Sequence, residues 1–454
     1  MKIQNILTAS ILALSLGGVS QAEEIIHVTG STAFRSAFVT SVERLMGGSG
    51  NFKAAYDNVS GTTEKNSNYS IFSGTISGVA TTIKCTWTGS VGGVIANSKQ
   101  VDIHNVPTNG WVSKTNLPGT NTVVGLASLS YTLDGEVQGN ASDVNMSDSQ
   151  QTSTGFAVPA LAVPTIAAAD PAVSVAGQVG VIVFDWVANN GSPATITNIT
   201  NQQAQNLLSG GVFLSTLTGS ASDYTTDGSG NPTGAVVYAI GRNFDSGTRL
   251  SEFAETGFGV FSLPQQVAVT VNGTVGAAGS TVKNIDLYPT DTLFAGQSFA
   301  LSYAVGNSGY SSGGTVGKLL ATPGSLGKGS ATNPPLFESF YGILGGYLVG
   351  YLGRSDAATA TSSSVFPGNT ARVLTFNGVA DTDVNVQQGL YQGWEYEYMY
   401  ETTRTGSTAL TANQKTVINA LYNGILKTDA PASGILIDSM AVSKSLEGGL
   451  ITHL

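Results

Sequence analysis

Residues 236–255 read VVYAIGRNFDSGTRLSEFAE and combine the features that decide the fold. The apolar run VVYAI is typical of a buried strand, the polar segment after it predicts a loop, and LSEFAE has the spacing of a helix. A second apolar run, residues 179–184, precedes a predicted helix that opens with a capping box from Thr200 to Gln203. Because strand, helix and strand alternate up to about residue 260, we expect an α/β fold with a parallel sheet.

The chain on either side of this unit shows weaker patterns. Residues 24–28 predict a short strand, and the apolar spacing after it predicts an amphipathic helix capped by Ser31 or Thr32. Residues 47–178 are rich in Gly, Ser, Thr and Asn and predict strands with long loops. The pattern then stays loose after the central unit until a last clear helix, which begins after Thr411.

The loop of the opening stretch has the chemistry of an anion site. Asp245 or Ser246 stands at the expected N-cap, and the amides of Gly247 and Thr248 follow in the first turn, where unpaired N–H groups attract anions. Arg242 adds a planar guanidinium suited to phosphate-like oxygens. The alternative for this segment alone is an ordinary helix cap with surface arginines.

Three further segments carry hydroxyl groups or a carboxylate near predicted strand ends. They are TGSTAF at 29–34, TGSVGGV at 88–94 and DVNMSDS at 143–149. Taken singly, the first is typical of a helix cap, the second of a turn and the third of a surface Asx turn.

In this chain order, the three segments and RNFDSGT at 242–248 resemble the motifs of the phosphate-binding proteins of ABC phosphate importers. RNFDSGT is the most specific, because the family carries R-x-x-x-SGT there. The resemblance implies an exported α/β protein with the two-lobed type II periplasmic-binding-protein fold, here with Gly/Ser/Thr-rich β insertions. It also implies that the chain captures inorganic phosphate between the lobes and delivers it to an ABC permease, as a monomer and without a cofactor.

The same resemblance implies the residues that contact the ligand. Hydroxyl or amide donors from both lobes would surround the anion, with one carboxylate among them. These residues are Ser31, Thr32, Ala33, Ser90, Ser147, Asp148, Arg242, Ser246, Gly247 and Thr248.

The carboxylate gives the expected site its selectivity. Asp148 can accept a hydrogen bond only from an oxyanion that still carries a proton, such as monohydrogen phosphate. Sulfate would leave the carboxylate unpaired, at a cost of about 1–3 kcal/mol when buried.

Two positions depart from the family pattern. Arg35 stands where a proline or small residue is common, which makes it an added ligand contact or a surface residue. Phe244 replaces a common acidic partner, so we expect Arg242 to be less restrained. We expect Arg249 to serve the surface of its helix or a nearby acidic side chain.

The predicted organisation is a signal peptide and two lobes. Lobe 1 comprises residues 23–180 and 350–454, and lobe 2 comprises residues 181–349. Strands near 180–187 and 340–352 cross between the lobes. Insertions relative to the family lie near residues 47–80, 95–135, 150–178 and 262–335.

The N-terminus and the charge balance point to export. Residues 1–22 have an early lysine, an apolar run and small residues near Ala22, as in a cleavable signal peptide, and no cysteine follows for a lipid anchor. The chain is therefore expected in the periplasm or secreted. A net charge of −10 argues against nucleic acid and anionic membranes as partners. Cys85 is the lone cysteine, which excludes an intrachain disulfide.

Four other functions agree with fewer features of the sequence. An exported structural or adhesion-like protein suits the Gly/Ser/Thr/Asn-rich loops, and it predicts a β-only fold without a helix at 246–258. Residues 309–313, GYSSG, match the serine hydrolase motif, but the histidine after it, His453, lies at the chain end. The segment GTVGKLL lacks the P-loop spacing, and the scattered histidines form no metal motif, so neither a nucleotide nor a metal is expected.

Overall fold

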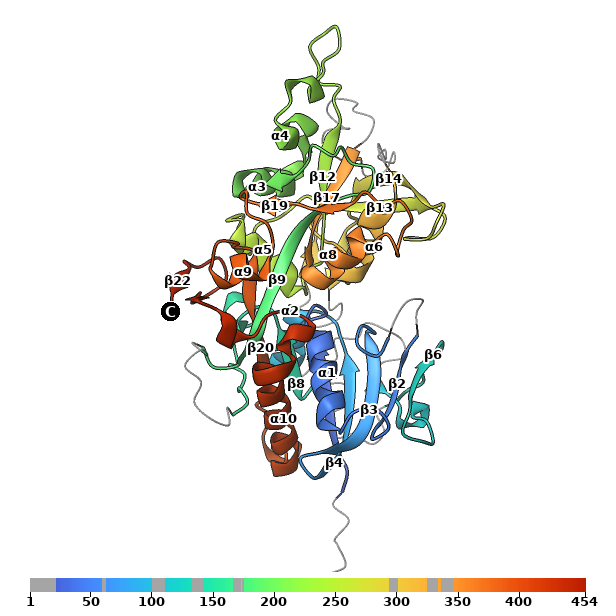
Figure 1. Cartoon of the computed structure of the whole chain (residues 1–454), viewed down its shortest axis with the longest axis vertical. Helices are drawn as coiled ribbons and strands as arrows, with labels where there is room; N and C mark the ends of the chain where they lie inside the picture. The colour runs from blue at the N-terminus through green and yellow to red at the C-terminus, as the bar shows by residue number, and fades with distance from the viewer. Residues whose placement is uncertain are drawn as a thin grey trace, which may run out of the picture.

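A computed structural model describes residues 22–58, 63–99, 111–132, 142–165, 173, 175–293, 301–324, 334–335 and 346–454. Within these residues, one mixed sheet of twelve strands runs through the molecule in the order β11-β12-β17-β9-β20-β8-β1-β4-β3-β2-β6, with β18 beside β9 (Figure 1). The predicted signal peptide lies, apart from Ala22, outside the described residues. The fold is α/β, as expected, although the sheet is mixed and not purely parallel.

The strands of the large sheet differ widely in length. They are β1 (Glu24–Gly30), β2 (Lys53–Asp57), β3 (Tyr69–Ile76), β4 (Val79–Thr86), β6 (Val123–Leu126), β8 (Val144–Ser147), β9 (Gln178–Ala188), β11 (Val212–Phe213), β12 (Val236–Ile240), β17 (Gly346–Gly353), β18 (Arg372–Val373) and β20 (Trp394–Glu401). Short strand pairs lie outside it: β5 (Trp111–Val112) with β7 (Tyr131–Thr132), β10 (Asn198–Ile199) with β19 (Thr375–Phe376), β13 (Val267–Asn272) with β14 (Thr281–Leu287), β15 (Asp291–Leu293) with β16 (Leu301–Tyr303), and β21 (Val442–Ser443) with β22 (Thr452–His453).

Helices cover the sheet in two groups, one for each half of the molecule (Figure 1). The lower half contains β1 to β8 and β20, with the helices α1 (Arg35–Leu45), α2 (Ser90–Lys99) and α10 (Ala412–Gly424). The upper half contains β11, β12 and β17, with the helices α3 (Asn201–Gly210), α4 (Leu214–Thr218), α5 (Gly247–Glu255), α6 (Gly313–Ala321), α8 (Arg354–Thr361) and α9 (Asp383–Gln387).

Strand β9 connects the two halves. Residues 178–183 pair with β20 of the lower half, and residues 184–188 pair with β17 of the upper half. Every residue of β9 is buried, because the strand lies in the middle of the sheet and is covered on both faces. It runs through the region where the first lobe crossing is expected, near residues 180–187.

The pairings suggest a later second crossing than the expected one. β17, which includes most of residues 340–352, lies between β12 and β9, and α8 after it packs against α6. The chain rejoins the lower half with β20, which pairs with β8. The division into lobes stays a prediction, and we propose that its second crossing lies between α9 and β20 and not near residue 350.

Helices with local capping signals begin where the sequence predicts. The side chain of Ser246 caps α5 by accepting the amide of Arg249 at 3.4 Å. Thr200 opens α3 and Thr411 opens α10, each with the full capping box. The presence of α5 contradicts the β-only fold that a structural or adhesion-like protein predicts.

The start of α1 differs from the prediction. Neither Ser31 nor Thr32 caps the helix; its N-cap is Phe34, which has no side-chain cap. The hydroxyl of Ser433, far along the chain, accepts the amide of Ala37 in the first turn at 2.9 Å. A tertiary contact therefore provides the cap that the local sequence was expected to provide.

Helix α2 was not predicted as a helix. The sequence of residues 88–94 is typical of a turn, yet residues 90–94 form the first half of α2, and all residues of this helix except Lys99 are buried. A helix buried on all sides has no amphipathic pattern to reveal it. Its glycines allow close packing, since a β-carbon at Gly93 would overlap Oδ1 of Asn145 and lie 2.9 Å from Cα of Gly30.

Within the described part of the chain, no helix combines the length and the apolar character needed to span a bilayer. The apolar run at 340–352 is described only from Gly346 onward, where it forms the largely buried strand β17.

Candidate functional site

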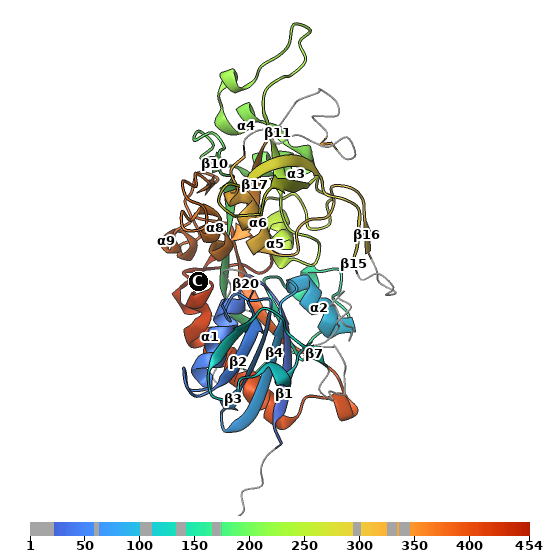
Figure 2. The same cartoon turned by 90° about the vertical axis from the view of Figure 1, so that its right-hand side faces the viewer.

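The N-termini of α2 and α5 meet between the two halves (Figure 2). The carbonyl oxygen of Asp245, just before α5, accepts the amide of Gly92 in α2 at 3.1 Å. Gly89 makes this approach possible, because its φ is +105° and a β-carbon there would lie 2.5 Å from the same carbonyl oxygen. The positive ends of two helix dipoles are therefore close together.

Asp148 lies at this junction, directly after β8. Its Oδ1 atom accepts a hydrogen bond from the hydroxyl of Ser90, at the start of α2. Its Oδ2 atom accepts a hydrogen bond from the hydroxyl of Thr248 in α5, at 3.2 Å. A β-carbon at Gly247 would overlap Oδ1, so only glycine fits there. One carboxylate thus joins the first turns of both helices.

Asp148 is strongly shielded from water, with 1% of its surface exposed. Burial raises the pKa of its carboxyl, while the Ser90 hydroxyl, the positive charge of Arg242 and the Thr248 hydroxyl act in the opposite direction. A buried carboxylate of this kind favours a neighbouring group that donates a hydrogen bond to it.

Arg242 follows β12 and is also 1% exposed. Its guanidinium donates from Nε to the carbonyl oxygen of Tyr310 at 3.1 Å and from Nη2 to that of Ser311 at 2.9 Å. The remaining nitrogen, Nη1, donates to the hydroxyl of Thr32 in the lower half at 3.4 Å. The guanidinium therefore reaches across the junction from a fixed position.

These contacts correct the expectation that Phe244 leaves Arg242 less restrained. Two backbone carbonyls hold the guanidinium in place of an acidic partner, and Phe244 instead packs against Tyr303 with a ring distance of 5.3 Å. The carbonyls belong to Tyr310 and Ser311 of the GYSSG segment, which thus supports the arginine.

Of the two expectations for Arg249, the one that places it on the surface of its helix is wrong. The side chain is 5% exposed and contacts Asn307, with Nη2 donating to Oδ1 at 2.9 Å, and lies over the ring of Phe253 at 5.0 Å. It also donates to the carbonyl oxygen of Arg242 at 3.4 Å. It does not serve the helix surface, because the loop around Asn307 covers this face of α5. The negative charge of Asp245 does act on Arg249, since it opposes the lowering of the guanidinium pKa by burial.

The other predicted site residues lie at the same junction and bond mainly to nearby backbone, although Ser31 also interacts with Glu397 on β20. The hydroxyl of Ser31 accepts the amide of Phe34 at 3.2 Å, that of Ser246 caps α5, and that of Ser147 donates to the carbonyl oxygen of Ser149 at 2.7 Å. Ala33 lies near Gly353 of β17. Their part in ligand binding stays a prediction.

Glu397 and Asp356 escaped the sequence analysis, which named Asp245 only as a possible N-cap and Arg35 as an added ligand contact or a surface residue. Burial raises the pKa of Asp245 to about 7, against the effect of Arg242. Glu397 on β20 is 0% exposed, and burial and the charge of Asp148 raise the pKa of its carboxyl well above its ordinary value. Arg35 and Asp356 approach from α1 and α8. Glu397 and Asp356 belong to no sequence motif, because each comes from a different element.

The described residues do not favour a metal centre or a serine hydrolase site. The described residues contain no group of His, Cys, Asp and Glu placed to hold a metal. His27 pairs with Asp143, their Nδ1 and Oδ2 atoms being 2.9 Å apart, and burial raises the pKa of Cys85 to about 12. His453, which the hydrolase interpretation needs, is exposed on the short strand β22 and pairs with Val442.

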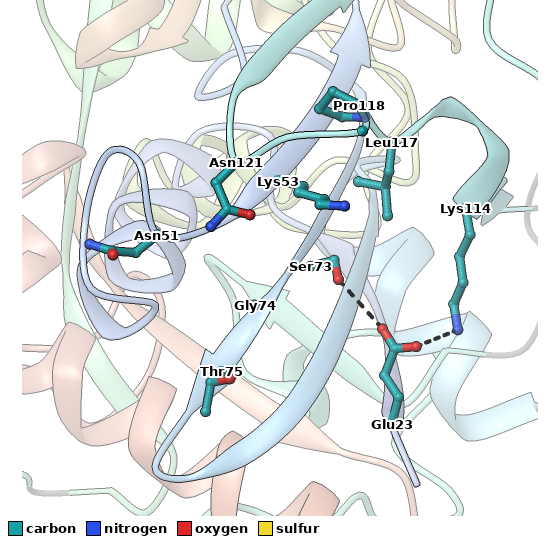
Figure 3. Close-up of a pocket in the computed structure, with 11 residues that line it drawn as sticks. Glu23, Asn51, Lys53, Ser73, Gly74, Thr75, Lys114, Leu117, Pro118 and Asn121 are labelled. Carbon is teal, nitrogen blue, oxygen red and sulfur yellow. Dashed lines mark hydrogen bonds and ion pairs between the residues drawn. The ribbon is translucent and has the colours of Figure 1, made fainter. Parts of the chain in front are cut away.

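A separate pocket of about 540 Å³ lies in the lower half (Figure 3). It lies over β2 and β3, and Lys53, Asn121 and Ser73 are among its lining side chains. Glu23 also lines the pocket, and its Oε2 atom accepts a hydrogen bond from Nζ of Lys114 at 3.1 Å. Its lining includes none of the predicted site residues.

Comparisons with known proteins find only distant likeness. No protein-family model matches the chain, and no curated protein matches its sequence. Among solved structures, it is similar to a Clostridium perfringens protein described as a phosphate ABC transporter substrate-binding protein with bound phosphate, at 12% identity and a TM-score of 0.38 over 91% of this chain and 99% of that one. A Vibrio cholerae ABC-type phosphate transport receptor has 10% identity and a TM-score of 0.37, over 90% and 99% of the two chains. PstS from Borrelia burgdorferi has 11% identity and a TM-score of 0.34, over 91% and 98%. Likeness at this level establishes neither a family nor a ligand.

Proposed function

We propose that this protein is an exported solute-binding protein that captures inorganic phosphate between its two halves. One observation carries the proposal: the buried carboxylate of Asp148 joins the first turns of α2 and α5, beside the fixed guanidinium of Arg242. Donors surround a carboxylate in this arrangement, which suits an oxyanion that still has a proton.

The local electrostatics favour an anion although the chain carries a net charge of −10. Each helix N-terminus contributes about 0.3–2 kcal/mol toward an anion. A charge-assisted hydrogen bond contributes about 1.5–3 kcal/mol. Two helix ends and one guanidinium thus favour an anion against the negative charge of the chain as a whole, which salt screens, while the buried carboxyl groups at the junction oppose it.

Ligand entry requires the two halves to separate. In the structure, Thr248 donates to Asp148 and Arg242 donates to Thr32, so the groups proposed to hold phosphate bind one another. We propose that opening about β9 and β20 breaks these contacts and that the ligand replaces them on closure. The ABC permease, export to the periplasm and the monomeric state belong to the same proposal. No covalent chemistry is part of it.

Titration calorimetry with phosphate and sulfate on the chain without residues 1–22 tests this function. We expect heat of binding with phosphate and an affinity for sulfate lower by a factor of about 5–150, the equivalent of 1–3 kcal/mol. Absence of binding to phosphate, or equal affinity for both ions, would contradict the proposal.

A further inference from the structure

Arg35 brings a second guanidinium to the junction from the lower half. It is the first residue of α1 and follows Ser31, Thr32 and Ala33 directly. Its side chain is partly buried, and Nη1 donates to Oδ1 of Asn68 at 2.5 Å. The contact with Asn68 is neutral, so it leaves the charge of Arg35 unbalanced.

Asp356 approaches the same place from the upper half. It lies in the first turn of α8, and its carboxylate reaches the N-terminus of α6. A β-carbon at Gly313 would overlap Oδ2 of Asp356 and lie 3.4 Å from Nη1 of Arg242. The Asp356 carboxylate and the Arg242 guanidinium therefore both lie beside Gly313. The N-cap of α6, Ser312, has no side-chain cap of its own.

The charges of these three residues act on one another. Burial raises the pKa of Asp356, and the positive charges of Arg35 and then Arg242 oppose that rise. Burial lowers the pKa of Arg35, Asp356 opposes this effect, and the like charge of Arg242 adds to it. The Asp356 carboxylate thus interacts with two guanidinium groups from opposite halves, whereas Asp148 and Asp245 interact with Arg242.

We infer that Asp356 is the resident counter-ion of Arg35 and Arg242 and that an oxyanion entering the junction competes with it for both guanidinium groups. This inference rests on the proposed function. It makes Arg35 a contributor to anion affinity and Asp356 a residue that lowers this affinity. Asp356 and Asp148 offset the charges of the two arginines, and Asp245 and Glu397 add two further carboxyl groups at the junction, which limits how tightly any anion is held.

The inference separates the roles of two carboxylates. Asp148 distinguishes an oxyanion with a proton from one without, because it would accept that proton in a hydrogen bond. Asp356 faces the two guanidinium groups and affects any anion through charge alone. Removing its charge should therefore strengthen phosphate and sulfate binding by the same factor, of about tenfold for a charge several ångströms away.

The test is titration calorimetry with phosphate and with sulfate on the wild type and on three variants. Asp356→Asn should bind both ions about tenfold more tightly, Arg35→Gln about tenfold more weakly, and the double variant close to the wild type. Asp227→Asn is the matched control, because it removes an exposed carboxylate that contacts Ser229 and Asn231 of its own turn, and it should leave both affinities unchanged.

The outcomes distinguish the inference from the function on which it rests. A wild type that binds neither ion overturns the proposed function, and the inference with it. A wild type that binds phosphate, with unchanged or weaker binding by folded Asp356→Asn, overturns the inference alone. If thermal unfolding shows that Asp356→Asn does not fold, Arg35→Gln decides: weaker binding of both ions supports the inference, and unchanged binding overturns it.

Discussion

Replacing Asp148 by asparagine probes the proposed selectivity most directly. The change keeps the size of the side chain and removes its charge. The two carboxylate oxygens of Asp148 accept hydroxyls from Ser90 and Thr248. An amide oxygen can still accept one of them, and the amide nitrogen can donate to the oxygen of the other. We therefore expect Asp148→Asn to fold.

The expected effect follows from the burial of this residue. Asp148 is 1% exposed, so an ion beside it cannot rely on water to satisfy or screen the carboxylate. A charged hydrogen bond gained by hydrogen phosphate, or an unpaired carboxylate left by sulfate, corresponds to about 1–3 kcal/mol. This energy equals about 5–150-fold in affinity. Asp148→Asn should reduce the preference for phosphate over sulfate by this factor, mainly because sulfate binds more tightly.

Calorimetric titrations at pH 7.5 and constant ionic strength would measure both affinities for the wild type and the variant. Asp356→Asn is the informative comparison, since it should change both affinities and leave their ratio intact. If folded Asp148→Asn kept the wild-type ratio of phosphate to sulfate affinity, the carboxylate would not be the group that distinguishes a protonated oxyanion from an unprotonated one.

Three further variants test other contacts of the site and its surroundings. Arg242→Lys should weaken phosphate binding at least tenfold in calorimetry. The physical reason is that an ammonium cannot reproduce the guanidinium contacts on both sides of the junction. Unaltered phosphate affinity in this variant would count against the proposed site. Gly247→Ala should lower both phosphate affinity and melting temperature, because its β-carbon overlaps Asp148, whereas Gly228→Ala, with open space around it, should change neither. Burial raises the pKa of Glu252 to about 8, above its unfolded value of 4.5, so the stability from its protonated form is present below about pH 4.5 and is lost as the pH rises through 8. The melting temperature of the wild type should fall over this range and that of Glu252→Gln should fall less; parallel profiles would contradict this account.

Local signals predicted much of the architecture. The apolar run VVYAI became β12, and Ser246, Thr200 and Thr411 cap the helices that follow them. These signals act within a few residues, so they are visible without knowledge of the rest of the chain. The α/β class followed from the alternation of such elements.

Predictions failed where distant segments determine the local structure. Ser433 caps α1 in place of Ser31 or Thr32, and the buried helix α2 shows no amphipathic pattern. The segment around Asn307 covers Arg249, so an arginine that looks exposed in the helix pattern is buried. Each of these contacts joins residues that are far apart in the chain.

The sequence by itself determined the class of the fold, the helix starts with their own caps, and the segments in which an anion site was expected. It did so because capping and apolar spacing are short-range properties. Only the tertiary structure decided that Asp148 joins α2 to α5, that backbone carbonyls hold Arg242, and that Asp356 reaches the two arginines. These arrangements depend on the position of β9 and β20 in the middle of one sheet, which brings elements from both halves to one junction. Charge interactions act through space, so their balance is set by that geometry and not by neighbours in the chain.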